Sequence, residues 1–396
     1  MVALPANVSS PPSLFPQRST SPPLPSTGLS SQPLSSHPLV THPSRQLSEP
    51  STVFDRLQSA SLLTAEYGSQ KLAETSVLPD LIFGVIAFQP RVRSRAPYHE
   101  GVRRWVHSVR THTSEARTHL LLFTGRGEGS IASDAAIARY LQEAGVSLVQ
   151  ADYQDHPSRV AHSDASQFVW CVVRNRWFVI ARYLAPRVGE YRYVLMCDTK
   201  DVILQAPPFE WGALTGGSHK GEWLRRAVVF SGEGSGRVRT LQQSKKGLPR
   251  TMMCAHGASA TQRQALLHTE PLNAGVTLGG AEAFLNFSLG MMRVIRRVTS
   301  KECIAVKDCT DQGLYNLLVY LYWGSELPHT RKLVLSMERA PSYTLGHKQP
   351  CCTVDSAGRV LNDARMVPPI VHQFAKGLAG RVLPRTLFWR KVTSRG

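Results

Sequence analysis

From about residue 80 the chain alternates between short, wholly apolar runs and longer segments with helical spacing of apolar positions. The apolar runs have the length of buried strands and lie at 81–88, 119–125, 146–152 and 191–198. The segments between them have one apolar face and predict helices around 102–109, 134–145 and 166–185. Strands without polar alternation, separated by amphipathic helices, predict a parallel sheet with helices on both faces.

The second half of the chain continues with a less regular order. It predicts strands at 227–234, 273–280 and 368–374 and helices at 281–298 and 311–323. We see no internal repeat and no second linker, so residues 76–390 are expected to form one domain, followed by a basic tail at 391–396. Residues 1–75 form a leader whose first 50 residues are dominated by Ser and Pro, a composition that predicts disorder.

The charge of the chain is strongly positive, but its distribution is uninformative about a partner. The formal net charge is +18 and the isoelectric point about 10.0 over 396 residues. Lys and Arg are scattered instead of forming a stripe with interleaved aromatic residues, so nucleic-acid binding is not expected. The charge therefore indicates only a surface that attracts anions.

Hydropathy predicts no membrane span, because no apolar run approaches the roughly 20 residues that a bilayer core requires. The nearest candidate, 168–185, has Arg174, Asn175 and Arg176 at its middle. A buried amphipathic helix is the better interpretation, with its arginines at a pocket rim or paired with acids. The leader has few acids before Glu49, as a transit peptide would, but its Pro content argues against a targeting helix.

The seven cysteines include no CxxC pair, so their spacing does not indicate a zinc site. Cys171 and Cys197 lie in apolar segments and are expected to be core thiols. The others could form disulfides in an oxidising lumen or stay reduced; these are Cys254, Cys303, Cys309, Cys351 and Cys352.

Candidate chemistry begins where one predicted strand ends. The stretch "YVLMCDTKDVILQ" (193–205) is apolar up to Cys197 and then carries Asp198 and Asp201. Ligands of α/β sheets bind beyond the carboxyl ends of the strands, and paired carboxylates suit Mg²⁺ or Mn²⁺. A late His372, at the end of a predicted strand, would add an imidazole that Mn²⁺ tolerates better. The alternative is an ordinary turn, with Asp201 paired to a nearby arginine.

Five segments together resemble a known family. "YVLMCDTKDVILQAPPF", "VVFSGEG", "LNAGVTLGG", "DQGLYN" and "PIVHQFAKG" have the order and rough spacing found in nucleotide-sugar-dependent glycosyltransferases of the GT-A fold. The chain is most similar to the branch with a D-x-x-D motif, as in the glucosyltransferase domain of lysyl hydroxylases and plant and algal relatives, and also to glycogenin-type enzymes. The resemblance covers about residues 80–378 and implies a Rossmann-like, mixed, mainly parallel sheet.

The resemblance also implies roles for individual residues. Asp198, Asp201 and His372 would hold Mn²⁺ (or Mg²⁺) against the donor diphosphate, and Lys376 would lie near that diphosphate. The nucleoside and the sugar of the donor would be contacted by Ala87, Phe88, Gln89, Asn273, Ala274, Gly275 and Gln312. Asp311 is the candidate acid that contacts the sugar. Transfer with retention needs no separate base, whereas inversion would need Asp311 or Glu233 to deprotonate the acceptor hydroxyl.

The resulting hypothesis is a metal-dependent hexosyltransferase that moves a sugar, most simply from a UDP-sugar, to a hydroxyl of a protein or glycan. The alternatives are a non-catalytic carbohydrate-binding or scaffold relative that kept the fold and, less favoured, a basic RNA-associated protein. Relatives work in the Golgi or endoplasmic reticulum lumen behind a membrane anchor; this chain displays none, so a plastid or soluble location stays open. Compared with the family, the segment 235–253 is a polar insertion, which leaves the acceptor undefined.

Overall fold

The computed structural model describes eleven stretches of the chain, and the structural statements below concern these residues alone. They are 78–85, 96–114, 118–125, 134–151, 176–211, 224–233, 240–243, 255, 257–298, 311–345 and 353–373. All of them lie in one compact unit that spans residues 50–396.

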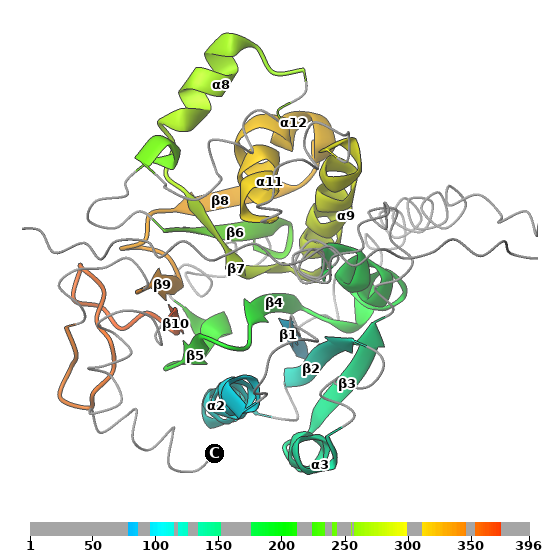
Figure 1. The fold of residues 1–396 in the computed structure, drawn as a ribbon, viewed down its shortest axis with the longest axis vertical. Coiled ribbons are helices and arrows are strands. Elements are labelled where there is room, and N and C mark those ends of the chain that lie inside the picture. Colours follow the sequence, from blue (N-terminus) through cyan, green and yellow to red (C-terminus); the bar gives the residue numbers. More distant parts are fainter. Residues whose placement is uncertain are drawn as a thin grey trace, which may run out of the picture. The chain divides into compact units, whose positions relative to one another are not determined.

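A seven-stranded sheet forms the centre of this unit (Figure 1). In spatial order its strands are β3 (Val146–Ala151), β2 (Thr118–Gly125), β1 (Asp80–Val85), β4 (Tyr193–Asp198), β7 (Leu272–Gly280), β6 (Ala227–Gly232) and β8 (Arg331–Leu335). All neighbours pair in parallel except β7, which runs antiparallel to both β4 and β6. The sheet is therefore mixed and mainly parallel, as the sequence predicts.

Helices cover both faces of the sheet, which confirms the predicted α/β class (Figure 1). Side chains alternate between the faces along each strand. Ile82 and Leu195 face a cluster with α2 (Ala96–His112) and α3 (Ala135–Glu143). Phe83 and Met196 face the opposite cluster, which contains the helical residues 176–184, α9 (Ala281–Val298) and α11 (Asp311–Leu317).

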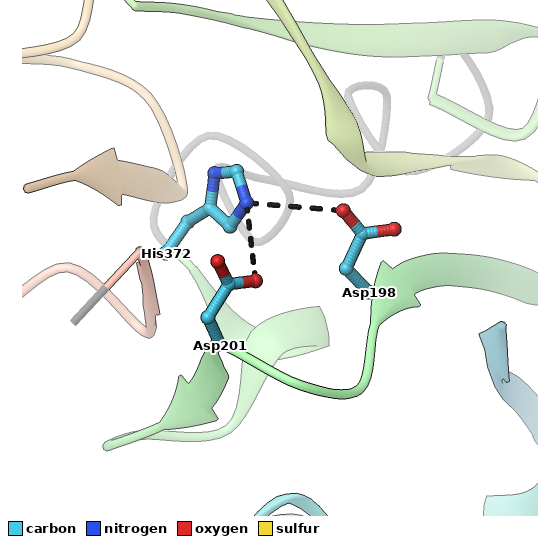
Figure 2. A group of neighbouring side chains, drawn as sticks. All are labelled: Asp198, Asp201 and His372. Carbon is cyan, nitrogen blue, oxygen red and sulfur yellow. Dashed lines mark ion pairs between the residues drawn. The ribbon is translucent and has the colours of Figure 1, made fainter. Parts of the chain in front are cut away.

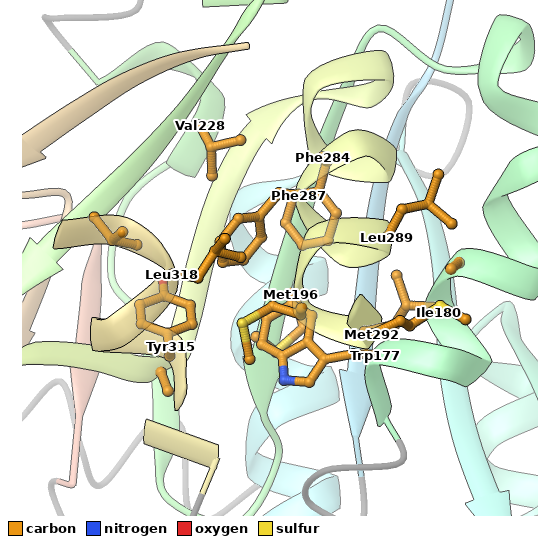
Figure 3. Packing of buried hydrophobic residues seen from close by; sticks show 14 of the residues in the cluster. Trp177, Ile180, Met196, Val228, Phe284, Phe287, Leu289, Met292, Tyr315 and Leu318 are labelled. Atoms are coloured by element: carbon orange, nitrogen blue, oxygen red, sulfur yellow. The ribbon is translucent and has the colours of Figure 1, made fainter. Parts of the chain in front are cut away.

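The second of these clusters contains a group of aromatic rings in contact with one another (Figure 3). Phe287 of α9 packs edge-on against Trp177, Phe230 and Tyr315 with ring centroids 5.1–5.3 Å apart. Edge-to-face pairs of this kind add to the stabilisation from burial alone. The cluster thereby fixes α9, α11 and residues 176–184 against one face of the sheet, and the last two carry polar groups of the candidate site.

Several shorter elements complete the described chain. The predicted helix at 311–323 is helical throughout, with a π-helical segment η7 (Leu318–Tyr322) between α11 and α12 (Trp323–Glu326). The others are α8 (Ala260–Leu267) and the 3-10 turns η4 (Ala185–Glu190), η5 (Pro208–Glu210) and η6 (Leu241–Gln243). No helix in the described stretches is long and apolar enough to cross a membrane.

A second, three-stranded sheet lies beside the first and was not expected as a separate unit (Figure 1). Its strands, in spatial order, are β5 (Val202–Leu204), β10 (Ile370–His372) and β9 (Ser342–Thr344). The sequence predicts a strand at 368–374, and β10 confirms it, although not as part of the main sheet. The strands β5, β8 and β9 and the helix α8 were not predicted.

Candidate metal site

The D-x-x-D turn joins the two sheets, because β4 ends at Asp198 and β5 begins at Val202. Thr199 between them is 2% exposed and lies over Gly84 of β1, where a Cβ would come within 2.2 Å of the Thr199 methyl carbon. On the other side, a Cβ on Gly101 of α2 would come within 2.9 Å of the Lys200 backbone. Two glycines without side chains therefore let the turn seat against β1 and α2.

The second sheet brings His372 to this turn. In the antiparallel pairing of β10 with β5, His372 is opposite Val202, the residue that follows Asp201. The next residue, Gln373, donates its backbone N–H to the Asp201 carbonyl at 2.7 Å and has a φ of 58°, which is unusual for a residue other than glycine. The backbone register, and not a chance approach of side chains, thus places the histidine beside the second aspartate.

Asp198, Asp201 and His372 converge on one point (Figure 2). His372 Nε2 lies 3.9 Å from Asp198 Oδ2 and 3.7 Å from Asp201 Oδ1, and one ligand atom of each residue lies within 4.8 Å of the other two. Ligand bonds of about 2.1 Å to a shared ion separate ligand atoms by about 3.0 Å at right angles and about 4.2 Å when opposite. The two distances from His372 fit such an ion.

Gly275 of β7 lies next to the ligand atoms of Asp198 and His372. A Cβ on Gly275 would lie 2.7 Å from Asp198 Oδ2 and 2.9 Å from His372 Nε2. Any other residue would push these ligand atoms apart. Two carboxylates and an imidazole that close on a glycine have the donor chemistry and the space that Mn²⁺ or Mg²⁺ requires.

Arg176, which the sequence placed at a pocket rim or in a pair with acids, is paired. Its side chain is 3% exposed and donates to Asp198 Oδ1 at 2.8 Å, to the Ala274 carbonyl at 2.7 Å and to Asp311 Oδ2. Burial alone would lower the pKa of Arg176, but the charges of Asp311 and Asp198 outweigh burial and raise it. A permanent positive charge thus links the two acids.

Asp311 is therefore placed inside the protein, 3% exposed, at the start of α11. Besides Arg176, the indole N–H of Trp177 donates to the same oxygen, Asp311 Oδ2, at 3.2 Å. Two hydrogen-bond donors, Arg176 and Trp177, therefore fix the orientation of the Asp311 carboxylate.

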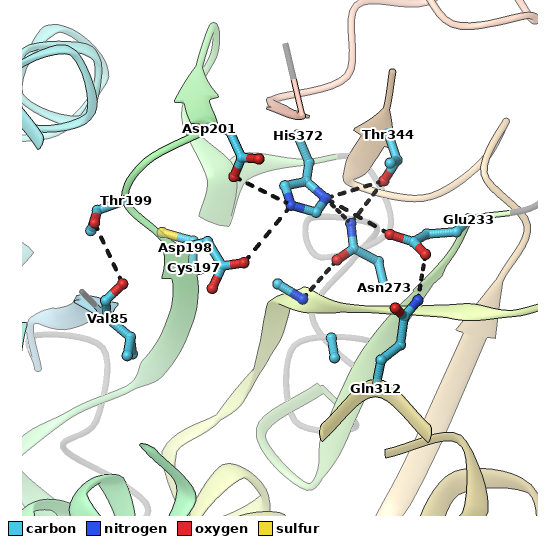
Figure 4. Close-up of polar contacts among 12 residues, drawn as sticks. Val85, Cys197, Asp198, Thr199, Asp201, Glu233, Asn273, Gln312, Thr344 and His372 are labelled. Atoms are coloured by element: carbon cyan, nitrogen blue, oxygen red, sulfur yellow. Dashed lines mark hydrogen bonds and ion pairs between the residues drawn. The ribbon is translucent and has the colours of Figure 1, made fainter. Parts of the chain in front are cut away.

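Glu233 and Gln312 lie on the side of His372 that faces away from Asp198 and Asp201 (Figure 4). Glu233 Oε1 is 4.0 Å from His372 Nδ1, and its other oxygen accepts a hydrogen bond from Gln312 Nε2. Gln312 Nε2 also donates to the Leu272 carbonyl at 2.9 Å. The side chain of Glu233 is 11% exposed, so it is more accessible than that of Asp311.

The Asn273 side chain, which the resemblance assigns to donor binding, makes hydrogen bonds within the protein (Figure 4). It is fully buried; its Nδ2 lies 2.8 Å from Thr344 Oγ1 and 2.6 Å from His372 Nδ1, and its Oδ1 accepts the Gly275 N–H at 2.7 Å. Thr344 belongs to β9 and was not singled out in the sequence. Only the pairing of β9 with β10, which sets Thr344 beside His372, reveals it.

The structure brings most of the predicted site residues together. Those within this network are Asp198, Asp201, Glu233, Asn273, Ala274, Gly275, Asp311, Gln312 and His372. Ala87, Phe88, Gln89 and Lys376 lie outside the described residues. So do all the cysteines except Cys197, which is a buried free thiol, as predicted.

Comparison with known proteins finds only weak likeness to solved structures. No family model and no curated protein matches the chain. A mouse xyloside xylosyltransferase in its apo form has a TM-score of 0.40 and 14% identity, over 74% of this chain and 97% of that one. The galactosyltransferase LgtC, with donor and acceptor sugar analogues, has a TM-score of 0.38 and 14% identity, over 80% of this chain and 95% of that one.

A core-mannan synthase from Aspergillus fumigatus, in a form with Mn and GDP, has a TM-score of 0.36 and 9% identity, over 67% of this chain and 74% of that one. All three TM-scores are below 0.5, so these structures say nothing about the function of this chain.

Proposed function

We propose that the protein is a metal-dependent glycosyltransferase that transfers a hexose from a nucleotide-sugar donor, with a UDP-sugar favoured, to a hydroxyl group of a protein or glycan. The observation that carries this proposal is the convergence of Asp198, Asp201 and His372 over Gly275. A metal ion that also binds a diphosphate needs only a few protein ligands, and this site offers three.

Mn²⁺ or Mg²⁺ bound there would neutralise the negative charge that grows on the leaving diphosphate. Arg176 donates to Asp198 Oδ1, and Asp198 Oδ2, which lies 3.9 Å from His372 Nε2, is proposed as the ligand atom. Lys376 is proposed to lie near the same diphosphate, where a cation would stabilise the departing charge.

Other residues would position the donor. Ala274 and Gly275 bring the backbone close to the site, and the proposed place of the donor sugar is beside them and Gln312. Asn273 would act there through its neighbours, because its amide is already bonded to protein groups. The end of β1 leads into Ala87, Phe88 and Gln89, which are proposed to hold the nucleoside.

Glu233 is the better candidate for a base if transfer inverts the anomeric carbon. Asp311 is bonded to Arg176 and Trp177, and an acid in that position orients its neighbours more readily than it exchanges protons. Glu233 is more exposed and accepts a hydrogen bond from Gln312 Nε2, which orients it. If transfer retains configuration, no separate base is required and Glu233 would only support Gln312.

The proposed setting is the secretory pathway, with a plastid or soluble location as alternatives. A carbohydrate-binding or scaffold protein that keeps the fold is the second candidate function. A binding protein would leave the donor intact, so metal-dependent release of the nucleoside diphosphate separates the two.

A donor screen tests the proposal. The purified full chain is incubated with Mn²⁺ and each of a set of UDP- and GDP-sugars, and release of the nucleoside diphosphate is measured. We expect hydrolysis of one donor that is lost on chelation and in Asp201→Ala, but kept in Asp355→Ala, which removes an acid paired with Arg359 at the surface. Hydrolysis that is indifferent to the chelator and to Asp201→Ala would refute the assignment.

A further inference from the structure

We propose that Asn273 and Thr344 are positioning residues that determine which ring nitrogen of His372 carries the proton, and thereby the affinity of the site for its metal ion. The inference rests on the proposed function for the identity of that ion. It adds two residues that would touch neither the ion nor the donor.

The first step concerns the polar atoms around His372 Nδ1, the nitrogen on the side away from the aspartates (Figure 4). The nearest is Asn273 Nδ2 at 2.6 Å, followed by Thr344 Oγ1 at 3.5 Å and Glu233 Oε1 at 4.0 Å. Asn273, Thr344 and His372 are 0%, 1% and 3% exposed. At this burial the protein groups, and not bulk water, decide the protonation pattern of the ring.

The second step concerns the orientation of the Asn273 amide. The Gly275 N–H donates to Asn273 Oδ1 at 2.7 Å, and a rotated amide would set two donors against each other there. The amide nitrogen therefore faces the ring, and an amide nitrogen can only donate. His372 Nδ1 must then accept, so the neutral ring carries its proton on Nε2, which faces Asp198 and Asp201.

The third step is the conflict between this arrangement and metal binding. A histidine binds a metal ion through a nitrogen without a proton, and its other nitrogen then donates to an acceptor that holds the ring in place. For Nε2 to bind the ion, the proton must sit on Nδ1 and find an acceptor. The Thr344 hydroxyl is suited to this, since it can accept from Nδ1 and from Asn273 together.

Asn273 and Thr344 thus favour opposite states of the ring. Asn273 favours the metal-free form, in which the ring proton is on Nε2 and faces the two aspartates. Thr344 supplies the acceptor for the metal-binding form, in which the proton is on Nδ1. The pairing of β9 with β10 fixes the backbone of Thr344 beside His372, which keeps the hydroxyl within reach of Nδ1.

The first experiment removes the acceptor. Thr344→Val keeps the shape of the side chain without the hydroxyl, and we expect Mn²⁺ to bind about 10- to 100-fold more weakly in a calorimetric titration. Thr344→Ser keeps the hydroxyl and should restore binding. The matched control is Ser342→Ala, since Ser342 is a fully buried residue of the same strand whose hydroxyl has no hydrogen-bond partner among the described residues.

The second experiment converts the donor at Nδ1 into an acceptor. In Asn273→Asp, carboxylate oxygens can accept from the Gly275 N–H, from Thr344 and from a proton on Nδ1. Nitrogen-15 NMR of the ring should detect no proton on Nδ1 of His372 in the metal-free wild type and a proton there in Asn273→Asp, together with tighter binding of Mn²⁺.

The outcomes separate this inference from the proposed function. A wild-type chain that does not bind Mn²⁺ would contradict the metal site, while the NMR comparison, which needs no metal, would still decide the placement of the proton. Thr344→Val that binds Mn²⁺ as Ser342→Ala does, or a proton on Nδ1 in the metal-free wild type, would overturn the role of Asn273 and Thr344.

Discussion

The two sheets differ in what builds them and in what they contribute to the site. The main sheet is large, apolar on both faces and covered by helices, and it supplies Asp198 at the end of β4 and Gly275 within β7. The second sheet has strands of three residues, yet it supplies His372 and Thr344 and lies against Asp201. The main sheet therefore contributes most of the buried core, and the second sheet supplies the residues that complete the candidate metal site.

The difference also concerns how position is specified. In the main sheet, packing of the strand side chains against helices on both faces fixes the register, because a slip by one residue would move every side chain to the opposite face. In the second sheet, short strands depend on particular polar contacts, such as the Gln373 N–H to the Asp201 carbonyl. Substitutions at such contacts should disturb the site more than the fold.

The largest effect on metal binding and activity is expected at Gly275, which lies between Asp198 of the main sheet and His372 of the second sheet. Gly275→Ala would place a Cβ within 2.7 Å of Asp198 Oδ2, so the ligand atoms could not close on an ion. We expect no measurable Mn²⁺ binding and activity lower by about two to three orders of magnitude, since metal stabilisation is worth several kcal/mol. Gly324→Ala in α12, where a Cβ meets no atom within 4 Å, is the control and should bind Mn²⁺ normally.

Arg176→Met tests how much the ion pairs of Arg176 with Asp198 and Asp311 contribute to the stability of the fold. It would leave Asp198 and the buried Asp311 without their shared partner, a change that costs about 3–5 kcal/mol when an ion pair is buried. Urea denaturation measures the loss. Arg359→Met breaks the surface pair with Asp355 and should cost about 1 kcal/mol or less. Similar losses for the two variants would mean that the buried network contributes little.

Gln373 tests the backbone of the second sheet. Its φ of 58° is tolerated by Asn but strained for a β-branched residue. Gln373→Val should therefore lower the free energy of unfolding by about 1–3 kcal/mol and weaken Mn²⁺ binding, whereas Gln373→Asn should change both less. Thermal unfolding with and without Mn²⁺ provides the measurement, and equal behaviour of the two variants would argue against this anchoring role.

The smallest effect concerns pH and the contact between α2 and residues 353–373. Burial, with the charges of Arg359 and His107, lowers the pKa of His112. The unfolded chain then binds this proton more readily, so folding stability should fall as the pH drops below about 6.5, the ordinary pKa of histidine. His112→Gln should reduce that fall between pH 7.5 and 5.5 in denaturant titrations. An unchanged pH dependence would assign the effect to other groups.

Much of the main sheet is predictable from the sequence, and most of the second sheet is not. Strands such as β1 and β4 are continuous apolar runs, and α9 has the predicted bounds of 281–298, because burial leaves a periodic pattern. Strands of three residues, such as β5 and β9, are too short for any period to be visible.

The candidate site follows the same division. Asp198, Asp201 and His372 could be proposed from residue type and position, since each follows or ends an apolar strand. The inward orientation of Asn273 and the role of Thr344 could not be, because both depend on which strands pair in the second sheet. Arg176 was expected at a pocket rim or in a pair with acids, and only the packing of residues 176–184 shows that it pairs, and with which acids.

The most direct test of the central claim is calorimetric titration of Mn²⁺ into the purified full chain, in the presence of UDP, for the wild type and Asp201→Asn. The two-sheet site predicts one saturable binding event in the wild type and its loss in Asp201→Asn, with thermal unfolding confirming that the variant is folded. A wild type that binds no Mn²⁺, or an Asp201→Asn variant that binds it equally well, would contradict the claim.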